Sequence, residues 1–406
     1  MKQRKKHTKS RTGCSECKRR KVKCDELRPR CANCRRQGSS CSYSRSDSSQ
    51  QTPGATPSLA GAAERKPWEA LIPQLSRCHT PGGNSPSWVD QSPFSRDAEL
   101  AHHWSTVTAD AMATDPDMRH MWRVVIPRIG YENCFVMHGV LAISALHKAY
   151  LMPGLAETYL NVSAHHQVRG SEGFRALLGN VTQDNWRPVF CFSGTFVAYM
   201  MCLPIRSPNG TIQSPVVSLL DLVAAMMGVQ ASIKPFLPVF MSSEFSPTVR
   251  NFGEIVDADS TRESNPDLEH SLLPHDTFNA LFTLRLFFEA ELPAGEQDPY
   301  LNAVDKLEAV ARVLGRAGLH ADPGVVFFWA TNLDQVIISD SRAFQHHALM
   351  LWAHFAVFLA GFERSFWYLR RWAKSIVGDV AQRVSETPRA AQVLQWPEKK
   401  VWERAL

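Results

Sequence analysis

Two cysteine-rich segments decide the fold of the N-terminal part, CSECKRRKVKC at residues 14–24 and CANCRRQGSSC at residues 31–41. Each reads C-x2-C-x6-C, and the second repeats the first at a shift of 17 residues. Residues 1–12 are strongly basic and no apolar run follows them, so they do not resemble a secretory signal. We therefore expect reduced thiols that bind metal rather than disulfides.

The number of thiolates indicates how many ions they bind. One tetrahedral zinc ion takes four thiolates, and two separate ions need eight. Six thiolates serve two ions if two of them bridge, and the repeat favours the equivalent positions Cys14 and Cys31 as the bridging pair. The alternative is one ion held by the two C-x2-C pairs, as in a zinc ribbon, which leaves Cys24 and Cys41 without a role.

We expect the two-zinc cluster. Its predicted ligands are Cys14, Cys17, Cys24, Cys31, Cys34 and Cys41. Because so short a segment has no apolar core, metal binding must supply its folding free energy.

Charge distinguishes the two halves of the repeat. Between the second and third cysteines, the first half carries five cations in six residues and the second half carries two. Residues 1–50 have a net charge of +12, whereas the whole chain has +6, so the remainder carries −6. A basic segment of this kind indicates a polyanionic partner.

The position of the basic run between two metal ligands fixes its geometry, which favours readout of base edges in addition to phosphate contacts. The alternative is a solvated basic face without sequence preference. The residues predicted to contact double-stranded DNA are Lys18, Arg19, Arg20, Lys21 and Lys23.

These residues resemble the fungal zinc binuclear cluster DNA-binding domain over about residues 7–43. The agreement extends to Asp25 and Glu26 after the third cysteine and to Pro29 before the fourth. The resemblance implies a nuclear transcription factor that reads CGG-like triplets, with Cys14 and Cys31 as bridging ligands. It also implies that Lys21 contacts bases and that Arg20 and Lys23 contact phosphates.

Three domains are expected: residues 1–45 with the cluster and a basic arm at 2–6, a linker at 46–95, and a body at 96–406. The linker is rich in Ser, Pro and Gly and is expected to be disordered. It shows no sustained heptad pattern, so we expect either a monomer or a homodimer formed through the body.

The body is predicted to be an all-α regulatory domain. Apolar residues recur at helical spacing, strand-like alternation is scarce, and a hydrophobic content of 44% suits a globular protein. The expected helices are 97–112, 133–151, 155–178, 185–203, 216–229, 276–291, 300–316 and 342–362.

Residues 188–205 are apolar and nearly long enough to cross a membrane, but Pro188 and Pro204 bracket them, so we expect a buried helix and no membrane span. Four methionines nearby are typical of core filling or of an apolar ligand pocket. They are Met200, Met201, Met226 and Met227.

The body also resembles the regulatory domain of fungal sterol uptake control proteins and related regulators of secondary metabolism. The resemblance rests on ELAHHW at 99–104, residues 122–127, HGVLAISALH at 138–147 and Tyr159. It implies a helical domain that can dimerise and that binds a sterol in some members. A sterol-responsive or lipid-responsive sensor is therefore one alternative.

The sequence contains none of the common nucleotide-binding, zinc-protease or hydrolase motifs. An enzyme tethered to nucleic acid is therefore the less favoured alternative, and we expect no catalytic residues. The histidine pairs at 102–103, 165–166 and 346–347 are expected to be structural, because adjacent helical residues point about 100° apart. Residues 254–276 are acidic and are expected to form a solvated loop rather than an activating surface.

The remaining expectation concerns the role of the whole chain. The sequence predicts a DNA-binding transcription regulator that resides in the nucleus and works with the transcription machinery, most naturally as an activator.

Overall fold

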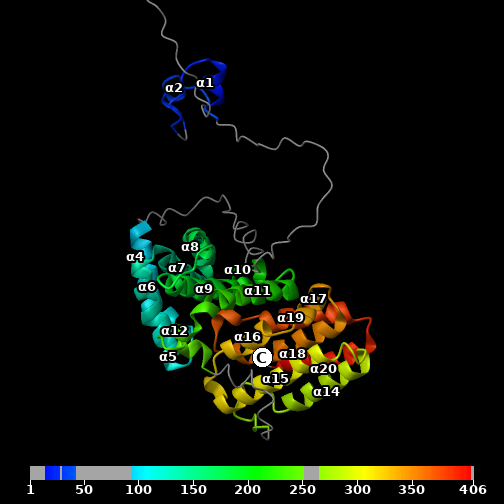
Figure 1. Ribbon diagram of the computed structural model, residues 1–406. Helices are drawn as coiled ribbons and strands as arrows, with labels where there is room; N and C mark the ends of the chain where they lie inside the picture. The colour runs from blue at the N-terminus through cyan, green and yellow to red at the C-terminus, as the bar shows by residue number, and fades with distance from the viewer. Residues whose placement is uncertain (1–13, 28–29, 43–92, 251–264, 404–406) are drawn as a thin grey trace, which may run out of the picture. The chain divides into compact units, whose positions relative to one another are not determined.

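The computed structural model describes residues 14–27, 30–42, 93–250 and 265–403. The chain divides into two compact units, Met1–Ala63 and Glu64–Leu406. All regular elements among the described residues are helical, with no strand, which confirms the predicted mostly-α fold class (Figure 1). The predicted linker lies almost wholly outside the described residues, and the domain boundaries at 45 and 95 stay predictions.

The first unit contains two short helices, α1 (Ser15–Arg19) and α2 (Ala32–Arg36). Each begins directly after the first cysteine of its half of the repeat, and the two helices contact each other. The buried apolar side chains of this unit are all cysteines among its described residues. Residues 14–27 and 30–42, the described part of this unit, therefore contain no hydrocarbon core that could stabilise it.

The second unit is built from helices throughout. Its longer helices are α4 (Pro93–His103), α6 (Ile126–Glu132), α7 (Cys134–Leu151), α8 (Ala156–Leu178), α9 (Trp186–Met201), α11 (Pro215–Ile233), α14 (Thr277–Glu291), α15 (Asp298–Ala317), α16 (Gly324–Thr331), α17 (Gln335–Arg342), α18 (His346–Phe362), α19 (Trp372–Val384) and α20 (Pro388–Glu403). Shorter helices are α5 (Pro116–His120), α10 (Leu203–Arg206) and α12 (Leu237–Met241).

All eight predicted helices are present, with two differences. The segment 97–112 continues from α4 into a π-helical turn and a 3-10 turn, Trp104–Thr108 and Ala109–Ala111. The segment 342–362 is divided, because Phe344 adopts a positive φ of 57° between α17 and α18. The predictions did not include α6, α16, α17, α19 and α20. For α16 the reason is physical, since its residues GVVFFWAT are apolar on every face and show no helical period.

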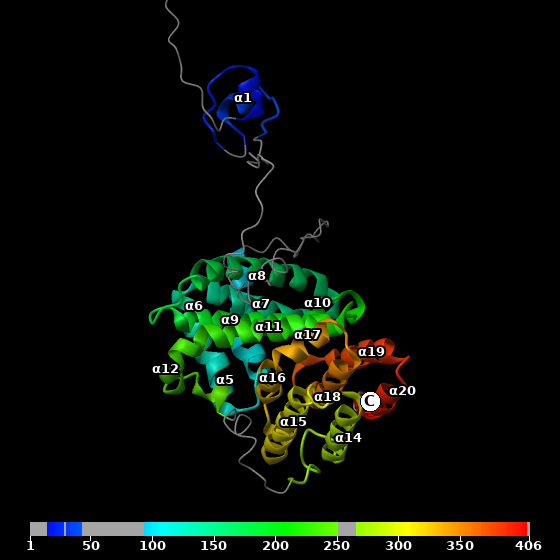
Figure 2. The same ribbon diagram turned by 45° about the vertical axis from the view of Figure 1, so that its right-hand side comes forward.

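Helix α18 forms the centre of the C-terminal half of the body. Nearly every residue from Ala348 to Phe362 is buried, as its uniformly apolar sequence requires. Helices α14, α15, α16, α17, α19 and α20 pack against it (Figures 1 and 2). The amphipathic helices α15, α19 and α20 therefore present polar faces outward and apolar faces to α18.

Fully buried tryptophans connect these elements. The indole N–H of Trp372 donates to the carbonyl of Met201 at 2.6 Å, and that of Trp329 donates to Ala303 at 2.8 Å. The N–H of Trp352 donates to Ser341 Oγ at 2.7 Å. Each ring buries a large apolar area without leaving its one donor unpaired.

Residues 188–205 form most of α9 and α10, and side chains such as Val189 and Phe192 are completely buried within the body. Two other helical stretches, Cys134–Leu151 and Pro215–Met241, are long and apolar enough to cross a bilayer by length and composition. Their most apolar parts are 61% and 44% buried by the rest of the body, and buried core helices pass the same test. Core packing therefore accounts for these helices as well.

We expect Gly139→Ala to destabilise the body. A Cβ at Gly139 of α7 would lie 3.0 Å from Thr195 Cβ of α9 and closer still to its hydroxyl, so the helices must move apart at a cost of about 1–3 kcal/mol. Gly378→Ala is the matched control, because no atom lies within 4 Å of the added Cβ and alanine at this exposed position favours the helical conformation of α19 by about 0.5–1 kcal/mol. Urea unfolding of both variants should give opposite signs, and equal effects would contradict this packing.

We expect the stability of the body to fall as the pH falls from about 6.5 to about 4. His354 is completely buried, donates Nδ1–H to the carbonyl of Met350 at 2.8 Å, and stacks on Trp396. Burial lowers its pKa to about 4. Below about pH 6.5 the imidazole therefore binds a proton in the unfolded chain but not in the folded chain. This difference lowers the free energy of unfolding by an amount that approaches roughly 3 kcal/mol near pH 4.

His354→Gln should reduce this pH dependence, whatever its effect at neutral pH. His102→Gln removes an exposed histidine of α4 and should leave the pH dependence unchanged. Urea midpoints measured at several pH values between 4 and 7 provide the comparison. An unchanged slope for His354→Gln would contradict the assignment.

Candidate metal centre and nucleic-acid interface

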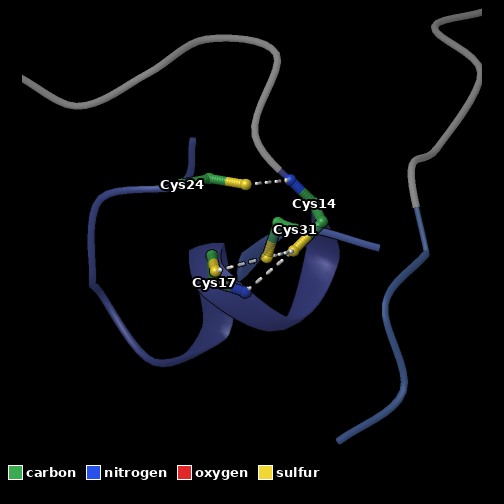
Figure 3. A group of neighbouring side chains, drawn as sticks. All are labelled: Cys14, Cys17, Cys24 and Cys31. Atoms are coloured by element: carbon green, nitrogen blue, oxygen red, sulfur yellow. Dashed lines mark hydrogen bonds between the residues drawn. The ribbon is translucent and has the colours of Figure 1, made fainter. Parts of the chain in front are cut away.

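The six cysteine sulfurs of the repeat come together in two overlapping groups. Cys14, Cys17, Cys24 and Cys31 form one group, and Cys14 and Cys31 join Cys34 and Cys41 in the other. Within each group all sulfur atoms lie within 4.8 Å of one another. Figure 3 shows the first group, with sulfurs from α1, from the start of α2 and from the loop at Cys24 pointing toward one another. The shared members are the two cysteines that the repeat predicted as the bridging pair.

The sulfur separations fit zinc. A tetrahedral ion with Zn–S bonds of about 2.3 Å holds its ligands roughly 3.8 Å apart. The distance between the Sγ atoms is 3.8 Å for Cys14 and Cys31, 3.7 Å for Cys14 and Cys34, and 3.6 Å for Cys17 and Cys31. These sulfurs are far beyond disulfide length, and all are free thiols, so the geometry suits metal coordination.

Backbone N–H groups help to position the sulfurs, and both halves of the repeat use the same pattern. Cys14 Sγ accepts from Cys17 N and Cys31 Sγ accepts from Cys34 N, each at 3.4 Å. Cys24 Sγ accepts from Cys14 N at 3.5 Å, as Cys41 Sγ does from Cys31 N at 3.3 Å. Each of the two shared sulfurs therefore also caps the N-terminus of a helix.

The two shared cysteines, Cys14 and Cys31, resist ionisation. At Cys14, the backbone N–H of Cys17 lowers the pKa, but burial and the neighbouring thiols together raise it to about 12. Cys31 shows the same balance, and its pKa is also raised. A divalent ion reverses this balance because it deprotonates its thiol ligands. Metal binding therefore stabilises the ionised form of these thiols.

A second reciprocal pairing joins the halves, and sequence reasoning missed it. The backbone N–H of Ser15 donates to the Ser42 carbonyl at 2.8 Å, and that of Ala32 donates to the Asp25 carboxylate at 3.0 Å. The 17-residue shift relates Ser15 to Ala32 and Asp25 to Ser42, so the two pairs are equivalent. The repeat therefore could have predicted this link between the halves. Asn33 adds a further link by donating Nδ2–H to the carbonyl of Lys23 at 2.7 Å.

The five predicted DNA-contacting cations all lie on the surface, at the end of α1 and in the loop that leads to Cys24. Arg19 differs from the others because its guanidinium forms two hydrogen bonds with Glu16, at 2.7 and 3.0 Å. No such carboxylate partner is seen for Lys18, Lys21 or Lys23 within the described part of the cluster. These lysines carry charges that are available to an external anion.

Lys21 adopts an unusual backbone conformation, with φ of 55°. The N–H of Lys21 bonds the carbonyl of Lys18 and that of Val22 bonds the carbonyl of Cys17, which is the Schellman termination of a helix. The equivalent termination of α2 places Gly38 in the left-handed position, with φ of 63°. A lysine thus occupies a position that glycine fills in the other half, at a conformational cost of roughly 1–2 kcal/mol.

The histidine pairs make contacts within the body. His166 lies 3.3 Å from Asp97 through Nε2 and 2.9 Å from His138 between the Nδ1 atoms. His347 lies 3.4 Å from Asp340. These contacts join separate helices, which is a structural role. Of the acidic segment 254–276, residues 254–264 lie outside the described residues, as does the basic arm at 2–6.

Comparison with known proteins agrees with the geometry of the cysteines. Residues 12–50 match the family described as the fungal Zn(2)-Cys(6) binuclear cluster domain. This segment therefore binds two zinc ions. The matched residues cover the whole repeat and its basic loop.

Three relatives share larger parts of the chain. A Zn(2)-C6 fungal-type transcription factor, afumD of Aspergillus fumigatus, is 33% identical over 160 residues, which are 38% of each protein. A Zn(2)-C6 fungal-type transcription factor of Gibberella zeae is 26% identical over 49% of this chain and 47% of the relative. Sterol uptake control protein 2 of Saccharomyces cerevisiae is 33% identical over 53% of this chain but only 22% of its own length. The chain thus spans less than half of each relative that it matches.

We expect zinc stoichiometry to distinguish bridging from terminal ligands. The full chain should carry two zinc ions in native mass spectrometry. Cys14→Ser removes a sulfur shared by both groups and should disturb both ions, whereas Cys24→Ser alters only one group and should leave one ion bound. Cys191→Ser, at a buried body cysteine outside the cluster, is the control and should retain two ions. Two ions in Cys14→Ser would contradict the shared position.

Proposed function

We propose that this protein, whose residues 12–50 form a fungal Zn(2)-Cys(6) binuclear cluster domain, is a sequence-specific DNA-binding transcription regulator. The observation that carries the proposal is the basic loop between Cys17 and Cys24. Both ends of this loop are metal ligands in the proposed cluster, and all its cations are exposed. A rigid basic element on a segment without an apolar core matches the surface of a DNA duplex.

Lys21 is the proposed base-reading residue. A backbone outlier indicates function when the surrounding structure holds it in place, and here the two hydrogen bonds that end α1 do so. Gly38 shows that the fold itself does not need a lysine at this position. A lysine ammonium can donate to O6 and N7 of guanine in the major groove, which fits the CGG-like triplets implied by the family resemblance.

The other cations are proposed to hold the phosphate backbone. Lys18, Arg20 and Lys23 flank Lys21 on the surface and would fix the register of the domain on DNA. Arg19 is proposed to contribute least, because Glu16 already neutralises part of its charge. This division assigns affinity to several residues and sequence preference chiefly to one.

The role of the whole protein follows from its relatives. Two of them are named as Zn(2)-C6 fungal-type transcription factors, and such proteins typically act in the nucleus and are not enzymes. We propose a nuclear regulator without catalytic activity that recruits the transcription machinery as an RNA polymerase II activator. Control of a secondary-metabolite or sterol-related pathway and homodimerisation through the helical body are part of the same proposal.

Lys21→Gly tests the base-reading role without disturbing the fold. Glycine relieves the left-handed strain, so the variant should retain two zinc ions and full stability. Its affinity for a duplex with a CGG triplet should fall by about 1–3 kcal/mol, whereas its affinity for a scrambled duplex should fall much less. Fluorescence anisotropy with both duplexes at several salt concentrations measures the difference.

Lys18→Ala is the matched control, because it removes one exposed positive charge from the same loop. It should weaken binding to both duplexes equally and reduce the slope of log K against log salt by about 0.9. Equal losses on both duplexes for Lys21→Gly would refute the base-reading role of Lys21.

A further inference from the structure

We propose that the helical body binds a small molecule that carries a phosphate or carboxylate group on an apolar framework, in the cavity where the turn between α18 and α19 meets α10 and α20. The cavity has a volume of about 570 Å³. Pocket volumes of this order accommodate metabolite-sized ligands. The site lies in the body and is separate from the DNA-binding loop.

Four cations line this cavity. Arg364 follows α18, Arg370 and Arg371 precede α19, and Lys374 lies in the first turn of α19. The part of the chain outside residues 1–50 has a net charge of −6. Four cations around one cavity are therefore unusual for this body. Three of the four, Arg364, Arg370 and Arg371, are exposed, so an anion that enters the hollow can reach them from solvent.

The one carboxylate that lines the cavity, Glu363, offsets the charge of these cations only in part, since Lys374 and Arg370 act on it without forming an ion pair. Glu363 Oε1 accepts from the N–H of Ala373 at 2.7 Å, and its Oε2 accepts from the N–H of Arg371 at 3.0 Å. Both oxygens are therefore used to cap the N-terminus of α19. No ion pair to a carboxylate is found for Arg364, Arg370 or Lys374 anywhere in the described residues.

Aromatic rings support two of the cations. The Arg370 guanidinium lies 5.5 Å from the centre of the Tyr150 ring, and the Lys374 ammonium lies 4.4 Å from that of Trp402. Such contacts hold the side chains without removing their charge or using their N–H donors. An incoming anion would meet donors that are already positioned.

Arg371 is held in place by the fold. It has a positive φ of 74°, and its Nη1 donates to the carbonyl of Asn209 at 3.0 Å. The guanidinium lies directly against Gly210, where any side chain would collide with it. A strained arginine fixed at the wall of a cavity is the kind of outlier that marks a binding site, and its remaining N–H donors can bind an anion.

The rest of the lining is apolar and defines the second half of the ligand. Ile205 of α10, Ala360 of α18 and Val401 of α20 line the cavity together with the ring of Tyr150. Such a surface suits a hydrocarbon or aromatic framework beside the anionic group. This site differs from the apolar pocket expected near the methionines, since Met201 lies in the core and Met200, Met226 and Met227 pack against it.

The test uses the zinc-loaded full chain with phenyl phosphate and inorganic phosphate as probes, at constant ionic strength. Thermal unfolding followed by tryptophan fluorescence reports mainly on the body, because nine of the 11 tryptophans lie in residues 96–406. Both probes should raise the unfolding midpoint in a saturable way. Phenyl phosphate should bind several-fold more tightly than inorganic phosphate, since only it contacts the apolar wall.

The double substitution Arg364→Gln with Lys374→Gln should weaken phenyl phosphate binding at least about tenfold in calorimetry, because charge-assisted hydrogen bonds are lost. The matched control is Lys399→Gln on α20, an exposed cation outside the cavity lining, which should leave binding unchanged. Equal midpoint shifts in the double variant and the control would overturn the site. Equal affinity for the two probes would overturn the apolar half of the assignment.

Discussion

Six sulfur atoms gathered in a segment without a hydrocarbon core are the constraint on which the DNA-binding unit depends. At the two shared cysteines, Cys14 and Cys31, burial and the neighbouring thiols raise the pKa against the lowering effect of a backbone N–H group. Two zinc ions offset both costs, since each supplies two positive charges at the centre of four sulfurs. The helices α1 and α2 are only one turn long, so their order derives from the metal and from the sulfur caps.

The unit is nearly symmetric in backbone but asymmetric in chemistry. Each half has a cysteine-capped helix, a Schellman termination and a donor pair to the other half, all related by the same 17-residue shift. The left-handed position carries Lys21 in one half and Gly38 in the other. The symmetric part builds the cluster, and the asymmetric residues give one side a basic surface for the duplex.

The body depends on a different interaction, the burial of large apolar rings around α18. Tryptophans from different helices bury their rings and use their single donors on backbone carbonyls or a serine hydroxyl, so the core is both apolar and directionally specified. The turn between α18 and α19 is the main departure from this pattern. It brings four cations to one cavity wall, and Arg371 there adopts a positive φ.

The sequence by itself determined the parts whose physics is local. Cysteine spacing predicted the six candidate ligands and the pair shared by both sulfur groups. The run after Cys17 predicted the basic loop, and helical periodicity predicted eight helices. Tertiary structure decided what depends on distant residues. Helix α16 lacks hydrophobic periodicity because other helices of the body bury it on nearly every face. The strain at Lys21 is visible only in its positive backbone φ. The cavity cations are brought together with residues of α10 and α20 only by folding, since no local pattern records which side chains will share a wall.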